Sequence, residues 1–284
     1  MARKRKKKKK GAKKDGLTAA TADKHELYEK SVQEPEADIE FIDKVFRKLG
    51  KPLPMSLRED FCGTAVFCAE WVKSHKKRTA VGLDLDLKTL NYGMERHIKP
   101  LGEAAERVQL LCRNVLQGST DKVDVLVAFN FSYWCFMTRR EMLQYFRKAR
   151  EGVKDQGLFV LDIYGGPDAQ VEVEEIQEKD GFEYVWDQGP MDAISHQAKR
   201  WIHFRFPDGT EQHKAFSYEW RIWSLPELSE VLLDAGFDRV DVYWEGSDKG
   251  GEGNGIFKKT RRAENEEAWI AYLVATPGIV PDQD

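Results

Sequence analysis

The sequence lacks two features of membrane and secreted proteins. None of its apolar runs approaches the roughly 20 residues that a membrane-spanning helix requires. The lysine-rich start is not followed by the apolar segment of a signal peptide. We therefore expect a cytoplasmic protein with no membrane partner.

Patterns of metal ligands are absent as well. The sequence has four cysteines, which show no paired spacing typical of metal sites. Three of its histidines, His196, His203 and His213, are 7 and 10 residues apart, which matches no compact metal site. The sequence thus predicts no metal cofactor. Reduced thiols are expected at Cys62, Cys68, Cys112 and Cys135.

The net charge of −3 conceals an uneven distribution. Residues 1–14 contain ten of the 45 basic residues and no acidic one, so the remainder holds 35 basic against 48 acidic residues, a net charge of −13. We interpret residues 1–24 as a disordered basic tail and residues 25–284 as the folded domain. The tail could bind nucleic acid. Because an acidic body repels a polyanion, however, a solvated extension is favoured over that role.

Helical and strand patterns alternate over the first half of the folded region. Short apolar runs bounded by turn residues predict strands, and apolar residues at helical spacing predict helices. Helices are expected at 37–49, 64–75, 87–98 and 138–151, and strands at 55–59, 79–84, 108–112, 123–129 and 157–163. This alternation predicts a parallel sheet with helices on both faces.

The pattern changes after the fifth strand. Longer strands are expected at 182–186, 198–206 and 212–223, with a hairpin turn at Pro207-Asp208-Gly209. We interpret residues 167–223 as an antiparallel insertion of about three strands. A helix after Ser224, a strand at 239–244, a glycine-rich loop at 246–255 and a strand at 268–275 follow. The predicted fold class is α/β, with a Rossmann-like, seven-stranded, mostly parallel sheet and a β insertion after strand 5.

A tight turn follows the first strand. Glu59 ends the strand, Gly63 allows a close turn, and a helix begins at once, so backbone N–H groups can approach a ligand. Asp84 ends the second strand, 21 residues after Gly63. An acid at that position can accept hydrogen bonds from both hydroxyls of a ribose. Together these residues indicate a ligand that contains adenosine.

This segment resembles that of class I S-adenosylmethionine-dependent methyltransferases, and the resemblance covers roughly residues 28–277. In that family an acid at the end of strand 1 precedes a turn of the form x-G-x-G-x-G. Glu59 matches the acid and Gly63 the second glycine, whereas Phe61 and Ala65 replace the first and third. The resemblance implies S-adenosylmethionine as the cofactor, with its methionine part at Glu59 and the turn, and its ribose at Asp84.

The resemblance also extends to later strand ends. It implies that Asn114, after the third strand, lies beside the adenine, and that Phe129 and Asn130 end the fourth strand over the reactive sulfur. The predicted cofactor-binding residues are Glu59, Phe61, Cys62, Gly63, Asp84, Leu85, Asn114, Val115, Phe129 and Asn130.

Acceptor residues are expected after the fourth and fifth strands and in the insertion. Asp162, Tyr164 and His203 are the candidate catalytic bases, although Asp162 and Tyr164 could simply end their strand. Substrate contacts are predicted at Tyr133, Trp220 and Arg221, since aromatic rings attract cations and arginine binds anionic groups. Arg221 could equally be a surface arginine that covers apolar area.

The predicted function is transfer of a methyl group to a nitrogen or oxygen of a small molecule, with the insertion covering the acceptor. One alternative is an RNA or protein methyltransferase that uses the basic tail. A nicotinamide-dependent oxidoreductase is another, which Phe61 and Ala65 disfavour because that class requires a G-x-G-x-x-G turn. The third is a non-catalytic module that binds nucleosides. The sequence does not indicate an oligomeric state.

Overall fold

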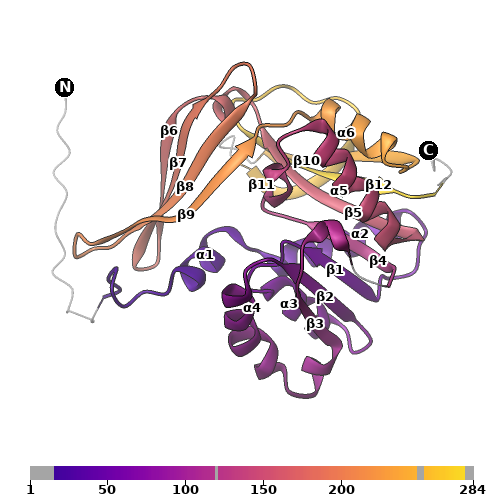
Figure 1. Ribbon diagram of the computed structural model, residues 1–284, viewed down its shortest axis with the longest axis horizontal. Helices are drawn as coiled ribbons and strands as arrows, with labels where there is room; N and C mark the ends of the chain where they lie inside the picture. The colour runs from indigo at the N-terminus through magenta and orange to yellow at the C-terminus, as the bar shows by residue number, and fades with distance from the viewer. Residues whose placement is uncertain (1–15, 119–120, 248–252, 279–284) are drawn as a thin grey trace.

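The computed structural model describes residues 16–118, 121–247 and 253–278, which form one large and one small sheet (Figure 1). The strands of the large sheet lie in the order β3-β2-β1-β4-β5-β12-β10-β11. Their bounds are β1 Ser56–Asp60, β2 Thr79–Asp84, β3 Val108–Cys112, β4 Val123–Ala128, β5 Val153–Gly165, β10 Arg239–Ser247, β11 Gly253–Thr260 and β12 Trp269–Thr276.

The strands from β3 to β5 run parallel to one another, whereas β12, β10 and β11 pair in antiparallel fashion. This arrangement confirms the predicted α/β class. The strand β11 was not predicted. Residues 246–255, expected to form a glycine-rich loop, belong to β10 at their start and to β11 at their end, and their middle lies outside the described residues. Gly255, at φ 68°, supplies a backbone conformation that glycine adopts readily.

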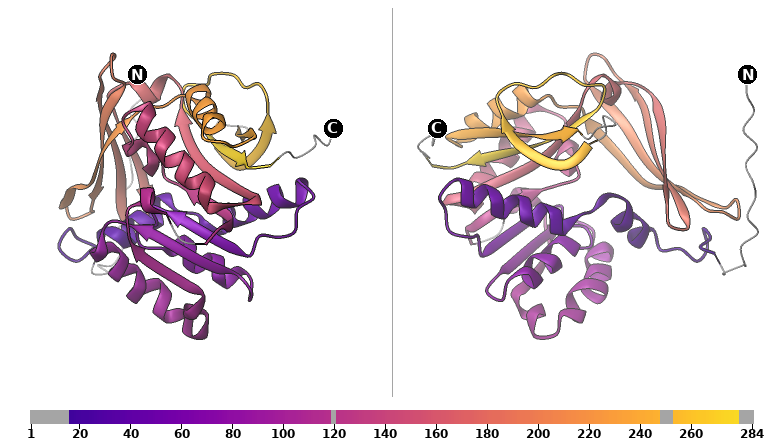
Figure 2. Two further views of the ribbon diagram at one scale, coloured as in Figure 1. Left: turned by 45° about the vertical axis from the view of Figure 1, so that its right-hand side comes forward. Right: turned by 180° about the vertical axis from the view of Figure 1, so that it is seen from behind.

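Helices cover both faces of the large sheet, as the alternating pattern predicts (Figure 2). In β4, Val125 and Val127 pack on one face into the core with α2 and α3, while Leu126 and Ala128 pack on the other with α5 and α6. Alternate side chains of a strand point to opposite faces, so a strand buried on both sides is apolar throughout. The helices are α1 Lys24–Val32, α2 Pro35–Lys48, α3 Val66–Ser74, α4 Leu87–Gly93, α5 Arg139–Gly152 and α6 Leu225–Asp234.

The insertion after β5 forms a separate antiparallel sheet, in the order β6-β7-β8-β9, that extends away from the large sheet (Figure 2). It has four strands where the sequence predicted about three: β6 Val173–Lys179, β7 Phe182–Met191, β8 Gln197–Arg205 and β9 Glu211–Arg221. The strand that was missed, β6, carries mostly exposed charged residues. It has no strong apolar alternation and is held by its pairing with β7.

The helix α1 connects the two sheets. Leu27 packs with Phe204 in the core of the small sheet. On the opposite side Glu29 accepts a 2.5 Å hydrogen bond from the Thr64 hydroxyl and lies 2.8 Å from the ring of His97. The N-terminal chain thereby spans from the insertion to the turn after β1. The predicted tail, residues 1–24, lies largely outside the described residues. Among those that are described, no helix is long and apolar enough to cross a membrane.

Candidate active site

The turn after β1 adopts the backbone of a glycine-rich loop with only one glycine. Phe61, Gly63 and Ala65 have φ values of 60°, 53° and 58°, all in the left-handed region. For residues other than glycine this conformation costs roughly 1–2 kcal/mol. Alternate residues therefore take the left-handed geometry at the three positions where the resembling family has glycines. Three residues of this turn are thus left-handed although only one of them is glycine.

Asp84 is joined directly to this turn. One carboxylate oxygen accepts a 2.9 Å hydrogen bond from the Gly63 amide, and the other accepts a 2.8 Å bond from the Asp86 amide. Glu59 pairs with Gly82 across the neighbouring parallel strands, so Glu59 and Asp84 end adjacent strands at the same edge of the sheet. The spatial relation that the sequence predicted for an adenosine-containing ligand is therefore present.

Three successive charged residues of β1 divide between the two faces of the sheet. The Arg58 guanidinium donates to the Asp60 carboxylate at 2.7 and 3.0 Å, and Tyr145 donates a further hydrogen bond to Asp60. Glu59 faces the opposite way, and its carboxylate is 3.0 Å from the Cys68 thiol. The buried arginine is consequently paired with Asp60, and Glu59 is left without a cation.

Glu59 is 6% exposed, and no ion pair among the described residues includes it. Burial raises its pKa to about 8, and repulsion from Asp84 adds to the rise. A buried carboxyl group without a cation is costly to ionise unless a ligand supplies the positive charge. The site is thus suited to a cationic group at the end of β1.

A second acid near Glu59 is absent from the sequence predictions. Asp38 of α2 accepts a hydrogen bond from the Tyr272 hydroxyl, and burial raises its pKa to about 6. Its negative charge also contributes to the raised pKa of Glu59. Asp38 occupies the apolar stripe of α2, three and four residues before Phe41 and Ile42. An acid in such a stripe is the signal by which the sequence could have revealed it.

The remaining residues predicted at the ends of β1 to β3 lie around this edge. Cys62 is buried, and its amide donates to the Leu83 carbonyl. Leu85 follows Asp84 and is 68% exposed. After β3, Asn114 caps a short helical turn, and the neighbouring Val115 is buried. These positions are compatible with their predicted contacts, which remain predictions.

The end of β4 is held by Asp162 of β5. Asn130 and Phe131 both have left-handed backbones, and their amides donate to the two oxygens of the Asp162 carboxylate at 2.6 and 3.0 Å. Tyr133 is fully buried and donates to the Asp162 carbonyl at 2.6 Å. Burial raises the pKa of Asp162 to about 7. The geometry gives Asp162 and Tyr133 a role in shaping this loop, whereas catalysis by Asp162 stays a prediction.

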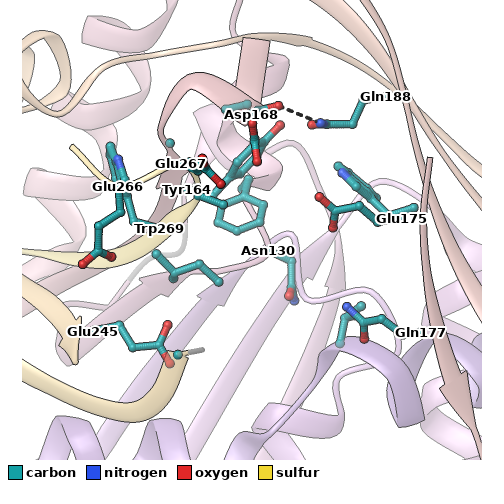
Figure 3. A pocket seen from close by; sticks show the side chains of 18 of the residues that line it. Asn130, Tyr164, Asp168, Glu175, Gln177, Gln188, Glu245, Glu266, Glu267 and Trp269 are labelled. Atoms are coloured by element: carbon teal, nitrogen blue, oxygen red, sulfur yellow. Dashed lines mark hydrogen bonds between the residues drawn. The ribbon is translucent and has the colours of Figure 1, made fainter. Parts of the chain in front are cut away.

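A cavity of about 880 Å³ lies between the small sheet and the ends of β4, β5 and β12 (Figure 3). Three of the predicted site residues, Asn130, Tyr164 and Trp220, line it, and so does Phe131, which was not assigned to the site from the sequence. The sheet of the insertion forms one wall, through Trp186 and Ile202 among others. The insertion, which the sequence predicted to cover the acceptor, thus borders the cavity, whereas Glu245 and residues 266–270 come from segments that were not assigned to the site.

The structure does not bring His203 or Arg221 to this cavity. Along β8 the side chain of Ile202 lines the cavity, so that of His203 points to the other face of the sheet. There His203 Nε2 lies 3.1 Å from Asp187, and Nδ1 accepts a 3.0 Å hydrogen bond from the Lys214 amide. Arg221 pairs with Glu227 at 2.7 Å and stacks on Trp223. Strand alternation separates both residues from Trp220 and the cavity.

The β8–β9 hairpin brings together two of the three histidines whose sequence spacing matched no metal site. His203, His213 and Glu211 have potential ligand atoms within 4.8 Å of one another. Both ring nitrogens of His203 already make hydrogen bonds. A metal would have to displace one of these bonds, so the arrangement is better described as a polar network on the outer face.

Comparison with solved structures agrees with this architecture. No protein-family model matches the chain, and no curated protein matches its sequence. A S-adenosylmethionine-dependent methyltransferase from Clostridium acetobutylicum superimposes with a TM-score of 0.65 at 14% identity, covering 89% of this chain and 97% of that one. Streptomyces venezuelae DesVI gives 0.63 at 18% identity, covering 89% and 96%.

The sugar N-methyltransferase KedS8 from Streptoalloteichus sp. gives a TM-score of 0.60 at 16% identity, covering 96% of this chain and 99% of that one. The coverage of each match includes nearly the whole of both chains, so the likeness extends beyond the large sheet. The chain therefore has the fold of S-adenosylmethionine-dependent methyltransferases.

Proposed function

We propose that the protein transfers a methyl group from S-adenosylmethionine to a nitrogen or oxygen atom of a small molecule. The observation that carries this proposal is the Asn130–Phe131 loop. This loop follows β4, the strand beside the one that carries Glu59, and both of its residues line the cavity beneath the small sheet. A donor and an acceptor bound on the two sides of this loop would meet at the end of β4.

The residues at the ends of β1 and β2 fit S-adenosylmethionine chemically. Glu59, buried and without a cationic partner, would hold the amino group of the methionine part. The amides of the turn and the carboxylate of Asp84 would hold the carboxylate and the ribose hydroxyls. When bound, this cofactor supplies a methyl group already activated at a sulfonium centre. The protein then has to bind, align and exclude water.

Tyr164 is the predicted catalytic residue that faces the cavity. Burial raises its pKa, which keeps the hydroxyl neutral, and Arg200 approaches it at 3.3 Å. In this state Tyr164 can orient an acceptor by hydrogen bonding. Small-molecule acceptors are further supported by the described activities of the structural neighbours, which include a sugar and a glycopeptide N-methyltransferase.

Two measurements test the proposal. Calorimetry should detect binding of S-adenosylmethionine to the purified protein, and absence of binding would reject it. Incubation with cell extract and a methyl-labelled donor, followed by size separation, should place the label in the small-molecule fraction. Label in RNA or protein that disappears when residues 2–14 are deleted would replace the small-molecule acceptor with a macromolecule.

A further inference from the structure

The cavity beneath the small sheet has a one-sided charge. Five carboxylates line it: Asp168, Glu175, Glu245, Glu266 and Glu267. Among the described residues, no lysine, arginine or histidine lines it. Figure 3 shows Glu175 on the side of the insertion and Glu245 and Glu266 across the cavity, with Tyr164 between them. A ligand in this space meets negative charge from two directions.

These acids differ from those on the outer face of the same sheet. Glu174 points outward and forms a 2.7 Å ion pair with Arg205. Its neighbour Glu175 points inward, and no ion pair within the described parts of the chain includes it or the other four cavity acids. Arg200 does not line the cavity: its guanidinium donates to the carbonyls of Ala169, Gly189 and Lys199 and, at 3.3 Å, to the hydroxyl of Tyr164, which does line it. Among the described residues that line the cavity, none carries a positive charge to balance these acids.

Independent evidence for a polar ligand comes from two buried side chains of the wall. Tyr184 is 6% and Trp220 4% exposed, and both line the cavity. Neither the Tyr184 hydroxyl nor the Trp220 indole N–H has a hydrogen-bond partner among the described residues, and neither atom is closed off from solvent, so both are open to a ligand in the cavity. A phenol oxygen can accept a bond from an ammonium group, while an indole N–H requires an oxygen or similar acceptor.

Aromatic rings line the same wall. Trp220 lies 4.6 Å from Tyr218 and 6.0 Å from Trp186 between ring centroids, and Phe131 lies 4.7 Å from Tyr164. Such faces attract alkylammonium groups and pack against sugar-like rings. The wall thus favours organic cations over hydrated metal ions.

We infer that the acceptor is a hydroxylated small molecule with two or more ammonium groups, and that a nitrogen of this oligoamine receives the methyl group. This inference rests on the proposed function. The acids without ion-pair partners favour a positively charged ligand, and the aromatic wall favours an organic cation over a metal ion. The indole N–H of Trp220 requires an acceptor, which a ligand with oxygen atoms would supply. An acceptor that carries a phosphate or carboxylate is disfavoured by repulsion from the same acids.

The reaction balances without a further reactant. A neutral nitrogen of the acceptor forms the new C–N bond as the C–S bond of the donor breaks, and the electron pair of that bond goes to sulfur. The nitrogen must first lose a proton if it is bound as ammonium, and a cavity carboxylate or solvent can take it. The remaining ammonium groups keep the acceptor in place during the transfer.

Calorimetry with four probes tests the inference, with and without S-adenosylmethionine. Kanamycin, a hydroxylated tetraamine, should bind more tightly than spermine, a tetraamine without oxygen, and both should bind more tightly than glucosamine, a hydroxylated monoamine. Glucosamine 6-phosphate should bind more weakly than glucosamine. Equal affinities along the charge series, or tighter binding of the phosphorylated sugar, would overturn the inference.

Matched variants separate the cavity from the general acidity of the protein. Glu175→Gln combined with Glu267→Gln should weaken kanamycin binding about tenfold, since each exposed ion pair contributes up to about 1 kcal/mol. Glu178→Gln combined with Glu264→Gln removes the same charge from residues that do not line this cavity and should change binding less than twofold. Equal effects of both pairs would contradict the inference.

Two further results keep this test distinct from that of the proposed function. The acid variants should bind S-adenosylmethionine as the unmodified protein does, because none of their substitutions lies at the ends of β1 or β2. Normal donor binding with no preference for oligoamines would overturn the acceptor class alone, whereas loss of donor binding in the unmodified protein would overturn the proposed function. A peptide of residues 2–14 that binds more tightly than kanamycin would overturn the small-molecule acceptor.

Discussion

The two sides of the site differ in how their acids are arranged. On the donor side, the acid is Glu59, which is buried in β1 next to the neighbouring strand β2. On the acceptor side, the acids are more exposed and come from segments as distant as Glu175 and Glu267. A single buried acid suits one fixed cation common to every reaction, while several more exposed acids suit an acceptor with several charges. In the proposed assignment, donor recognition is therefore local in sequence, whereas acceptor recognition depends on the assembly of distant segments.

The largest effect is expected on the donor side, from Asp84→Ala. The carboxylate positions the Gly63 amide and is proposed to bind the ribose, and hydrogen bonds to charged groups contribute about 1.5–3 kcal/mol each. Affinity for S-adenosylmethionine should therefore fall about 100-fold by calorimetry. Asp86→Ala is the matched control, because Asp86 only caps α4. An Asp84→Ala variant that binds the donor unchanged would remove the basis for the assignment.

A smaller loss of donor affinity, about tenfold, is expected for Glu59→Gln, since hydrogen bonding persists while the charge is lost. With a pKa of about 8, Glu59 is mostly protonated at pH 7, so a cationic donor should displace its proton on binding. Calorimetry in two buffers of different ionisation enthalpy should detect this release at pH 7 in the unmodified protein but not in the variant. Equal proton release in both proteins would show that Glu59 does not bind the cation.

Glu59→Gln should weaken donor binding, but it should make the donor-free protein more stable relative to the unmodified protein as the pH rises. The pKa of Glu59 is about 8 in the folded state against an ordinary 4.5, so its contribution is fully present below pH 4.5 and is lost as the pH rises towards 8. Glutamine does not titrate. The melting temperature of Glu59→Gln relative to the unmodified, donor-free protein should therefore increase between pH 5 and pH 8. A constant difference would contradict the raised pKa.

The contrast between the two sides also explains what could be predicted from the sequence. The alternation of apolar strands and helices was sufficient for the α/β fold, and Glu59, Gly63 and Asp84 could be predicted to lie together because they stand at or just after the ends of strands that share one edge. The insertion was predicted to cover the acceptor, but most of the individual wall residues were not predicted, since they depend on how the small sheet docks. His203 and Trp220 were both selected as aromatic or titratable residues in strands, but only their positions on opposite faces of the sheet distinguish them.

The loop between the two sides is tested by Asp162→Asn. An amide has one acceptor oxygen, so it can accept from only one of the Asn130 and Phe131 amides, and its NH₂ group would face the other. We expect a loss of about 1–2 kcal/mol in unfolding free energy and faster hydrogen exchange at these two amides. Asp168→Asn is the control, because its carboxylate holds no described amide.

If Asp162 positions this loop, methyl transfer by Asp162→Asn should slow without a change in the shape of its pH profile. Loss of a titration near pH 7, where the pKa of Asp162 lies, would instead identify it as the base. The measurement thus decides between the predicted catalytic role and the positioning role that the hydrogen bonds favour.

Small effects are expected at the turn, from Gly63→Ala and, the smallest of all, from Ala65→Gly. Ala65 has a left-handed backbone, so glycine should relieve strain, but it also leaves a small void at a fully buried position and adds freedom to the unfolded chain. The net change in unfolding free energy should stay within about 1 kcal/mol. Gly63→Ala meets no atom within 4 Å of the added carbon, so it should cost only the backbone strain, roughly 1–2 kcal/mol. Denaturant unfolding measures both changes.

If the turn is defined by its backbone and not by its glycines, Ala65→Gly should also bind the donor within about threefold of the unmodified protein. A larger change in affinity would show that the alanine methyl itself shapes the donor site.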